Sequence, residues 1–194
     1  MIRRVCVFCG SSAGTVTAHR DAAIELGNAL LRSGKGLVYG GGSVGLMGIL
    51  ADTLLQGGGE VIGVIPEMLA VKELLHPRVS PMHIVPSMHA RKALMAELCD
   101  AFIALPGGYG TFEELLEAIT WSQLGIHRKP IGILNVSGFY TPLVNMIDHA
   151  ILEGFIKPDH RDLVVVEENP AALLTRLATH QIPTVHKWIR AEES

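Results

Sequence analysis

The residues best suited to chemistry lie in one stretch, 105–114 (LPGGYGTFEE). It follows the apolar run 101–105 and opens the amphipathic run 112–123, so the order predicts a strand, a glycine turn and a helix. Such a turn presents backbone N–H groups and the positive end of a helix dipole, which suits a phosphate. Glycines leave room for a ligand to approach the backbone closely. Because Glu114 lies one turn into the helix, the stretch combines an anion site with a carboxylate, which is more than phosphate binding requires.

Glu114 also has a purely structural interpretation. Thr111 and Glu114 have the spacing of a capping box, in which threonine at the N-cap and glutamate at N3 satisfy backbone donors without any substrate. The spacing favours neither interpretation. Arg91 and Lys92, near the start of the predicted helix 88–99, resemble an ordinary solvated pair, but cations are unfavourable at a helix N-terminus, which points to an anionic partner.

A second glycine string, Gly40-x-Gly42-x-x-Gly45, matches the dinucleotide pattern GxGxxG. That pattern belongs to the first strand of a fold and needs an acid at the end of the next strand. Here it follows the second predicted strand, and Glu60 begins a strand instead of ending it. Leu46 stands where a P-loop has its lysine. A nucleotide-shaped crevice is compatible with these observations, whereas NAD and a P-loop are not.

Strands and helices alternate along the chain. The apolar and glycine patterns predict strands at 5–9, 36–39, 61–65, 83–85, 101–105, 130–134 and 163–166, and helices at about 18–33, up to 56, 88–99, 112–123, 140–153 and after 170, with a short helix and loop in 67–82. This order predicts an α/β fold, a three-layer, doubly wound parallel sheet of Rossmann-like, nucleotide-binding type, as a single domain over 1–194. Ligands of such sheets bind beyond the carboxyl ends of the strands. The turns at Gly10, Gly40 and Gly107 fall there, so we expect them to line one crevice.

Composition narrows the function classes. A net charge of −3 gives no general attraction to nucleic acid or anionic membranes, so no nucleic-acid or membrane partner is expected. The sequence contains no apolar run long enough for a membrane span and no signal-peptide pattern, which predicts a cytoplasmic protein. Cys6 and Cys9 have CxxC spacing, but on a strand they point to opposite faces, which favours two buried small side chains. No histidine spacing indicates a metal site.

Two motifs carry a resemblance to a known family. The stretch 106–114 (PGGYGTFEE) resembles the PGGxGTxxE motif, and 88–92 (MHARK) the MHxRK motif, of the LOG (Lonely Guy) family, often labelled "possible lysine decarboxylase". The separation of 23 residues between Arg91 and Glu114 also fits. Further agreement lies in 9–12 (CGSS), 39–42 (YGGG) and 119–127 (ITWSQLGIH). The resemblance runs from residue 5 to about 153, and the chain past 169 matches only loosely.

The resemblance implies an enzyme that hydrolyses the N-glycosidic bond of an adenosine 5′-monophosphate, often N6-substituted, and releases free base and ribose 5-phosphate. It implies no cofactor, a small nucleoside monophosphate as partner, and a homodimer with its active sites near the interface. Carried over to this chain, it assigns catalysis to Arg91 and Glu114. It assigns substrate contacts to Ser11, Gly41, Gly42, Glu73, Met88, Lys92, Gly107, Gly108, Tyr109, Gly110, Thr111 and Thr120, with Glu73 in a segment that matches loosely.

Three other functions are alternatives to this one. A nucleotide or molybdopterin carrier would use similar glycine turns, but it would not need both Arg91 and Glu114. A lysine decarboxylase needs a lysine bound to pyridoxal phosphate, and no lysine here has a suitable setting. A DNA-binding relative is disfavoured by the net charge of −3.

Overall fold

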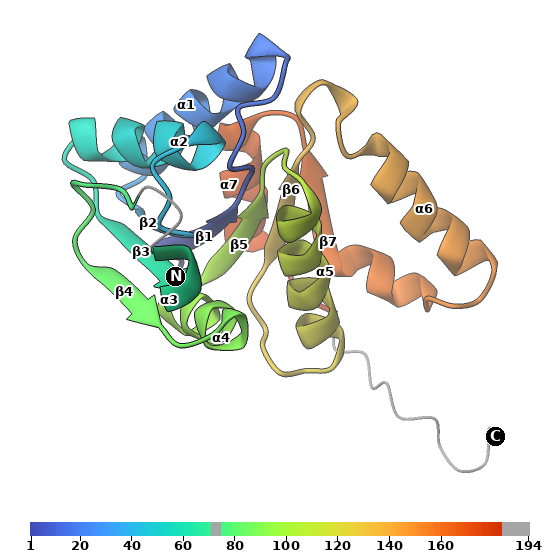
Figure 1. Cartoon of the computed structure of the whole chain (residues 1–194). Coiled ribbons are helices and arrows are strands. Elements are labelled where there is room, and N and C mark those ends of the chain that lie inside the picture. Colours follow the sequence, from blue (N-terminus) through green and yellow to red (C-terminus); the bar gives the residue numbers. More distant parts are fainter. Residues whose placement is uncertain (71–74, 184–194) are drawn as a thin grey trace.

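The computed structural model describes residues 1–70 and 75–183 (Figure 1). Its strands are β1 (Arg4–Phe8), β2 (Gly36–Tyr39), β3 (Val61–Pro66), β4 (Met82–Val85), β5 (Ala101–Ala104), β6 (Ile131–Leu134) and β7 (Val164–Glu167). Its α-helices are α1 (Thr17–Arg32), α2 (Gly45–Gln56), α3 (Glu67–Ala70), α4 (Met88–Leu98), α5 (Tyr109–Gln123), α6 (Thr141–Leu152) and α7 (Pro170–Thr179), joined by the 3-10 helices η1 (Val136–Gly138) and η2 (Pro158–Leu163).

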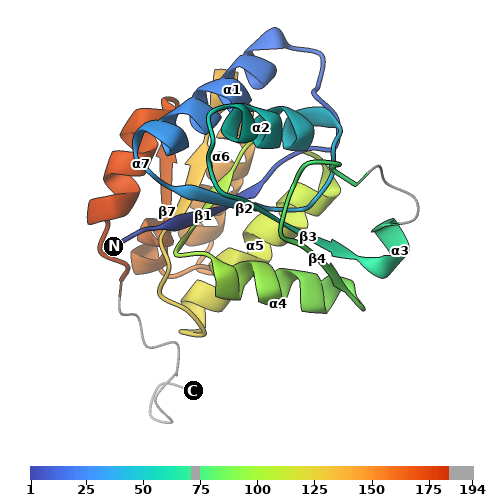
Figure 2. The ribbon, with the colours of Figure 1, turned by 90° about the vertical axis from the view of Figure 1, so that its left-hand side faces the viewer.

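The seven strands form one sheet in the order β4-β3-β2-β1-β5-β6-β7, and every neighbouring pair is parallel. The direction of winding reverses between β1 and β5, where Val5 pairs with Ala101. Helices cover both faces, with α1 and α2 on one side and α4 and α5 on the other (Figure 2). The predicted α/β fold of Rossmann-like type is therefore confirmed, and β4 extends one edge of the sheet.

Two apolar layers hold the helices to the sheet. One joins α1, α2 and α7 to the sheet through residues such as Leu26, Leu50 and Leu173, which are all fully buried. The other joins α4 and α5 to the opposite face through Met95 and Leu115. Cys6 belongs to the second layer and Cys9 to the first, and both are free thiols, so their predicted placement on opposite faces is confirmed.

The three glycine turns meet at the carboxyl ends of the strands, as predicted. The N–H of Gly10 donates to the carbonyl of Pro106 at 3.1 Å, and the N–H of Leu46 at the start of α2 donates to the carbonyl of Gly10 at 3.0 Å. Gly45 has a φ of +62°, and a Cβ there would lie 2.3 Å from the backbone of Ser11. Close backbone packing between the first two turns therefore requires glycine at position 45.

Helix α6 buries none of its residues. The other α-helices, apart from the short α3, each have buried residues. It stands at the outside of the molecule beside α5 (Figure 1). Its exposed apolar side chains include Met146 at 70% and Leu152 at 84% exposure, and Phe155 just beyond the helix is 86% exposed. No helix among residues 1–70 and 75–183 is long and apolar enough to cross a membrane.

Candidate functional site

A cavity of about 300 Å³ lies where the glycine turns converge. Its floor comes from the end of β1, and its walls come from the turns after β1, β2 and β5 together with α4 and the start of α5. The described residues that line it are Val7, Phe8, Cys9, Gly10, Ser11, Gly40, Met47, Leu69, Met88, Arg91, Met95, Gly108, Tyr109, Gly110, Thr111 and Glu114. This is the carboxyl-end crevice at the switch point where parallel α/β sheets bind ligands.

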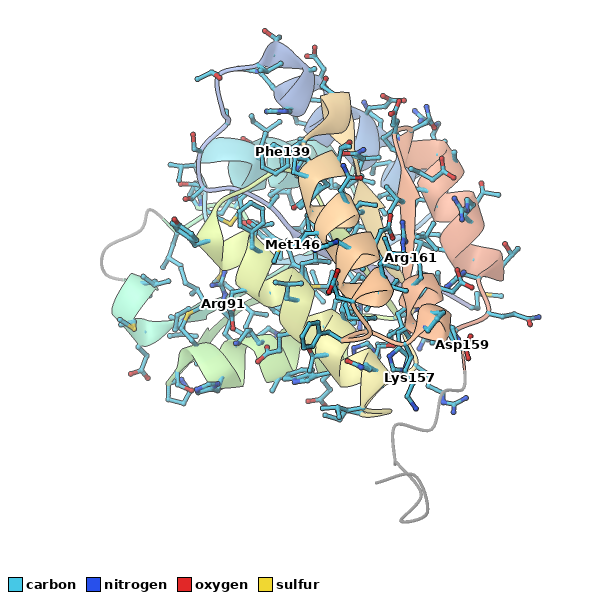
Figure 3. The ribbon with its side chains drawn as sticks, turned by 90° about the vertical axis from the view of Figure 1, so that its right-hand side faces the viewer. Arg91, Phe139, Met146, Lys157, Asp159 and Arg161 are labelled. Carbon is cyan, nitrogen blue, oxygen red and sulfur yellow. The ribbon has the colours of Figure 1, made fainter. Side chains whose placement is uncertain are left out.

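Arg91 and Glu114 are the charged residues of this lining. Arg91 projects from α4 and Glu114 from α5, and their closest atoms, Nη1 and Oε1, are 3.6 Å apart. The Arg91 guanidinium is held by backbone carbonyls: Nε donates to Val64 at 3.1 Å and Nη2 to Gly40 at 3.3 Å. Figure 3 places Arg91 beside α3 and α4. These two bonds hold the guanidinium of Arg91 in place, so the carboxylate oxygens of Glu114 remain available to a ligand.

Burial changes the acidity of Glu114. Its residue is 8% exposed, and this desolvation raises the pKa of its carboxyl group to about 7, although the charge of Arg91 acts in the opposite direction. A carboxyl group that titrates near neutral pH in a cavity is typical of a functional site. The buried thiols of Cys6 on β1 and of Cys9 directly after β1 also have raised pKa values because of burial.

Helix α5 starts at Tyr109, three residues earlier than predicted, and its N-cap is Gly108, which makes no side-chain capping bond. Thr111 is thus in the first turn of the helix and is not its cap, so the capping-box interpretation of Thr111 and Glu114 is wrong. The first N–H groups of the helix have no acceptor within it, and they lie at the end of α5 that lines the cavity. A cap without a side chain leaves these groups to a ligand, and the helix dipole favours an anion there.

The structure brings together only part of the set that the sequence predicted. Arg91, Glu114, Ser11, Met88, Gly108, Tyr109, Gly110 and Thr111 all line the cavity. Gly107 lies beside it, where a Cβ would be 2.1 Å from the Thr111 hydroxyl. Gly41 and Gly42 pack behind the lining, against Met82 and Leu75 respectively. Glu73 lies outside the described residues.

Lys92 and Thr120 are placed differently from the expectation. Lys92 is not a solvated neighbour of the site: it is 7% exposed, and its ammonium binds Glu113 and Glu117 on α5. The hydroxyl of Thr120 donates to the carbonyl of Leu116 at 2.7 Å, and its side chain lines a different, apolar cavity between α5 and α6. Neither residue lines the cavity of Arg91 and Glu114.

Two residues of this region, Gly40 and Tyr140, make contacts that the sequence did not predict. Gly40 touches the catalytic candidate, since a Cβ at that position would lie 2.1 Å from Nη2 of Arg91. Its place as first glycine of the 40–45 string was the available signal. Tyr140, which is 1% exposed, donates its hydroxyl to the carbonyl of Leu105 at 2.7 Å and so fixes the strand end before the glycine turn. Nothing in the sequence around Tyr140 indicated this long-range contact.

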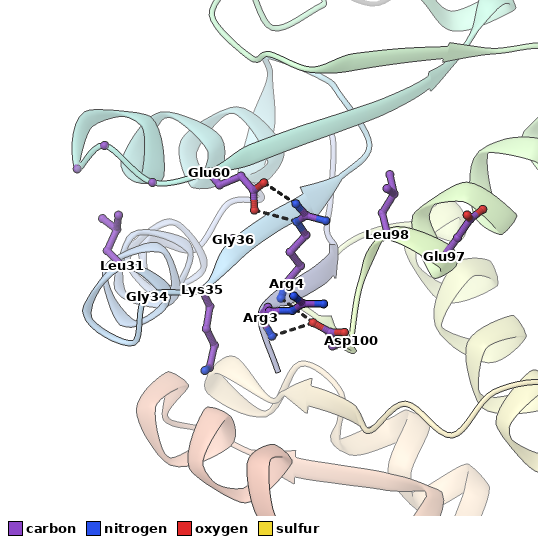
Figure 4. Close-up of a pocket in the computed structure, with 13 residues that line it drawn as sticks. Arg3, Arg4, Leu31, Gly34, Lys35, Gly36, Glu60, Glu97, Leu98 and Asp100 are labelled. Carbon is purple, nitrogen blue, oxygen red and sulfur yellow. Dashed lines mark hydrogen bonds and ion pairs between the residues drawn. The ribbon is translucent and has the colours of Figure 1, made fainter. Parts of the chain in front are cut away.

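A larger cavity, of about 670 Å³, lies at the opposite edge of the sheet (Figure 4). Three of its charged side chains already have partners: Arg4 and Glu60 form two bonds of 2.8 Å, and the Asp100 carboxylate accepts from the backbone N–H groups of Arg3 and Arg4. This edge holds the amino ends of the strands, where parallel sheets do not usually bind ligands. Glu60 is therefore part of a surface pair and not a ribose ligand, which agrees with the exclusion of NAD.

Other chemistries find little support in the described part of the chain. No group of three or more His, Cys, Asp or Glu side chains there could hold a metal ion. No described lysine lines the cavity, and Lys129 binds the carbonyls of Ala96 and Cys99 at the end of α4. Among these residues a pyridoxal phosphate lysine therefore has no candidate.

Comparison with known proteins places these features in a family. Residues 47–177 match the model of a protein family described as "Possible lysine decarboxylase". A cytokinin riboside 5′-monophosphate phosphoribohydrolase of Arabidopsis thaliana is 54% identical over 192 residues, which cover 99% of this chain and 89% of that protein. A probable enzyme of the same name from Oryza sativa subsp. japonica is 56% identical over 174 residues, covering 90% of this chain and 78% of the relative.

Solved structures show the same fold at lower identity. The molybdenum cofactor carrier protein of Chlamydomonas reinhardtii has a TM-score of 0.69 and 22% identity, over 92% of this chain and 99% of that one. The molybdenum cofactor binding protein of Rippkaea orientalis has a TM-score of 0.69 and 20% identity, over 92% and 97% of the two chains. At these identities the likeness extends to the fold alone.

Proposed function

Since the chain belongs to the LOG family of cytokinin riboside 5′-monophosphate phosphoribohydrolases, we propose that it hydrolyses the N-glycosidic bond of adenosine 5′-monophosphates, with or without an N6 substituent. The products are the free base and ribose 5-phosphate. It is an N-glycosyl hydrolase like its relatives at over 50% identity, and the decarboxylase wording of the family description does not describe its chemistry.

One observation carries the assignment of roles: the buried carboxylate of Glu114 lies beside Arg91 and beneath the open N-terminus of α5. The 5′-phosphate would bind the N–H groups of the first turn of α5, at the positive end of its dipole. This placement holds the ribose next to Glu114. Glycosidic cleavage passes through an oxocarbenium-like sugar, and a fixed anion in a water-poor site stabilises the positive charge that develops there.

Glu114 acts in its ionised form, either by holding the ribose hydroxyls against the developing charge or by aligning the attacking water. Arg91 supplies a cation on the other side of the reaction centre, for the phosphate or for the departing purine. Tyr109 is 93% exposed at the mouth of the cavity, where its ring can cover a bound base. Ser11, Gly41, Gly42, Met88, Gly107, Gly108, Gly110 and Thr111 complete the proposed binding site, and Glu73 and Thr120 are carried over from the family.

A substrate panel tests the proposal. Purified protein is incubated with AMP, N6-isopentenyl-AMP, GMP and the corresponding nucleosides without phosphate, and free base is measured by HPLC. We expect base release from the adenine monophosphates and at least about 10²-fold slower release from the nucleosides, because the phosphate anchors the sugar. Tight AMP binding without turnover would favour a nucleotide carrier instead.

We also propose that the chain works as a homodimer in the cytoplasm. The apolar surface of α6 and the neighbouring Leu116, which is 43% exposed, supports an assembly because a water-exposed apolar face of this kind is usually covered by a partner. Figure 3 looks onto this face, with Met146 labelled on α6.

A further inference from the structure

Lys92 follows Arg91 on α4 but binds different side chains. Its ammonium forms ion pairs with Oε1 of Glu113 and, at 3.0 Å, with Oε1 of Glu117, both on α5. These two glutamates lie on either side of Glu114 in the sequence of α5. The lysine side chain is only 7% exposed, whereas the side chains of its partners are 53% and 24% exposed. Lys92 is therefore a buried cation that crosses from the helix of Arg91 to the helix of Glu114.

The electrostatic balance keeps this cation charged. Burial lowers the pKa of Lys92, but its hydrogen bonds and its attraction to Glu113 and Glu117 outweigh burial, so the pKa is raised overall. The ammonium neutralises one of the two negative charges next to Glu114. Its donors are occupied by protein carboxylates, and it does not line the cavity.

We propose that Lys92 is a positioning residue, which ties α4 to α5 so that Arg91 and Glu114 keep their separation, and whose charge keeps Glu114 ionised. This inference rests on the proposed function for its catalytic meaning. It gives Lys92 a role other than the substrate contact that the family resemblance implies.

The charged and titratable groups around Glu114 determine in which direction its pKa changes when Lys92 is removed. Arg91 and Lys92 on α4 favour its ionised form, whereas Glu113 and Glu117 on α5 oppose it. Cys6 on β1, Cys9 directly after β1 and Tyr140 at the start of α6 also interact with the Glu114 charge, but burial raises the pKa values of all three, so they stay neutral. Removing Lys92 would leave Arg91 as the only one of these cations, so the pKa of Glu114 should rise.

The test compares Lys92→Met with Lys92→Arg and with Lys35→Met, a matched loss of charge at the amino edge of the sheet, where Lys35 Nζ donates to the Ile2 carbonyl. For Lys92→Met we expect the acidic limb of the kcat/KM profile to move up by about one pH unit. At pH 6.5 kcat should fall roughly tenfold, while KM changes little. Lys92→Arg should retain the wild-type profile, because it keeps a cation between the helices, and Lys35→Met should not move it.

A charge-balanced variant separates electrostatics from damage to the fold. Lys92→Met combined with Glu117→Gln restores the net charge of the cluster, so its acidic limb should return toward the wild-type position. Glu117→Gln alone should move the limb to lower pH, which keeps the proposal testable even if Lys92→Met does not fold. A raised KM for AMP with an unmoved limb in Lys92→Met would show that Lys92 contacts the substrate and would overturn the proposal.

A second readout does not depend on turnover. The Glu114 carboxyl can be titrated by NMR in protein with ¹³C-labelled glutamate and no substrate, with its signal assigned from Glu114→Gln. A higher pKa of Glu114 in Lys92→Met supports the positioning role, and an unchanged pKa contradicts it. If the wild type releases no base from any monophosphate, the proposed function fails, while this titration still decides the coupling between Lys92 and Glu114.

Discussion

Arg91 and Glu114 face each other at 3.6 Å across the end of the sheet, with side chains that are 10% and 9% exposed. This separation is longer than a hydrogen bond, and the closest bonds of the guanidinium go to the carbonyls of Val64 and Gly40. The two charges therefore attract each other without exhausting the acceptor capacity of the carboxylate. Such an arrangement holds a charged group ready for a substrate instead of closing it in a static salt bridge.

Replacing Glu114 by glutamine should lower kcat for base release from AMP by at least about 10²-fold, because it removes the anion that stabilises the sugar cation. The fold should be retained, since Gly108 and not Thr111 caps α5. HPLC of free adenine and a thermal melt measure the two effects. Glu97→Gln, on the exposed side of α4, is the matched control. Full activity in Glu114→Gln would remove Glu114 from the mechanism.

The activity of the wild type should rise with pH through about 7. Burial raises the pKa of Glu114 to about 7, and the proposed mechanism uses its ionised form. The profile of kcat/KM for AMP between pH 5 and 9 measures this limb. A limb that follows only the second ionisation of the substrate phosphate, near a pKa of about 6, would contradict the role of Glu114. Activity that falls as pH rises through 7 would instead indicate that Glu114 acts as an acid.

The same group makes stability depend on pH. Because its folded-state pKa of about 7 is above the ordinary value of 4.5, the folded state binds the proton more tightly than the unfolded state does. The free energy of unfolding should therefore fall as pH rises from 4.5 to 7, by up to about 3 kcal/mol from Glu114 alone. Urea unfolding of the wild type and of Glu114→Gln at pH 5 and pH 8 measures it. Relative to the wild type, the glutamine variant should have a higher free energy of unfolding at pH 8 than at pH 5. If the difference in free energy between the two proteins is the same at both pH values, the pKa of Glu114 is not raised in the folded state.

Local patterns in the sequence were enough for the fold. Alternating apolar runs and glycine turns predicted the parallel sheet and the meeting of the turns at Gly10, Gly40 and Gly107, because these signals depend on neighbours along the chain. The choice of Arg91 and Glu114 came from a family resemblance, and their roles stay a prediction until tested. What the structure adds is that both are buried in one cavity.

Contacts between distant segments could not be predicted in this way. The cap of α5 was misplaced because Gly108 ends the turn without any side-chain bond, which the TxxE spacing cannot reveal. The family resemblance implied a substrate contact for Lys92, and the sequence alone could not show that the carboxylates of Glu113 and Glu117 on the next helix bind its ammonium. The burial of Arg91 similarly depends on the carbonyl of Val64, which lies 27 residues away.

The molecular mass of the protein in solution tests the proposed homodimer directly. Light scattering on the eluting protein should give twice the 20.9 kDa of one chain. Met146→Glu should shift it toward the monomer, because a charge would enter the apolar face of α6, where Met146 is 70% exposed. Val16→Glu, at an exposed apolar residue before α1, is the matched control and should leave the mass unchanged. A monomeric wild type at micromolar concentration would contradict the proposal.

Gly40 gives the most local test of the Arg91 position. It directly follows β2, its φ lies in a region open to other residues, and a Cβ there would come within 2.1 Å of Nη2 of Arg91. Alanine at position 40 must therefore displace the guanidinium and break its bond to the Gly40 carbonyl, while the strand itself can remain. We expect kcat/KM for AMP to fall at least about 10²-fold, since small displacements of a charged group at the reaction centre are costly.

Gly34→Ala is the control. Gly34 lies after α1 with nothing within 4 Å of its Cβ, and alanine at its φ of +62° should cost about 1 kcal/mol of stability without loss of activity. Equal activity losses in the two variants would indicate general destabilisation, whereas a loss confined to Gly40→Ala, with an unchanged melting temperature, would place the Arg91 guanidinium at the reaction centre.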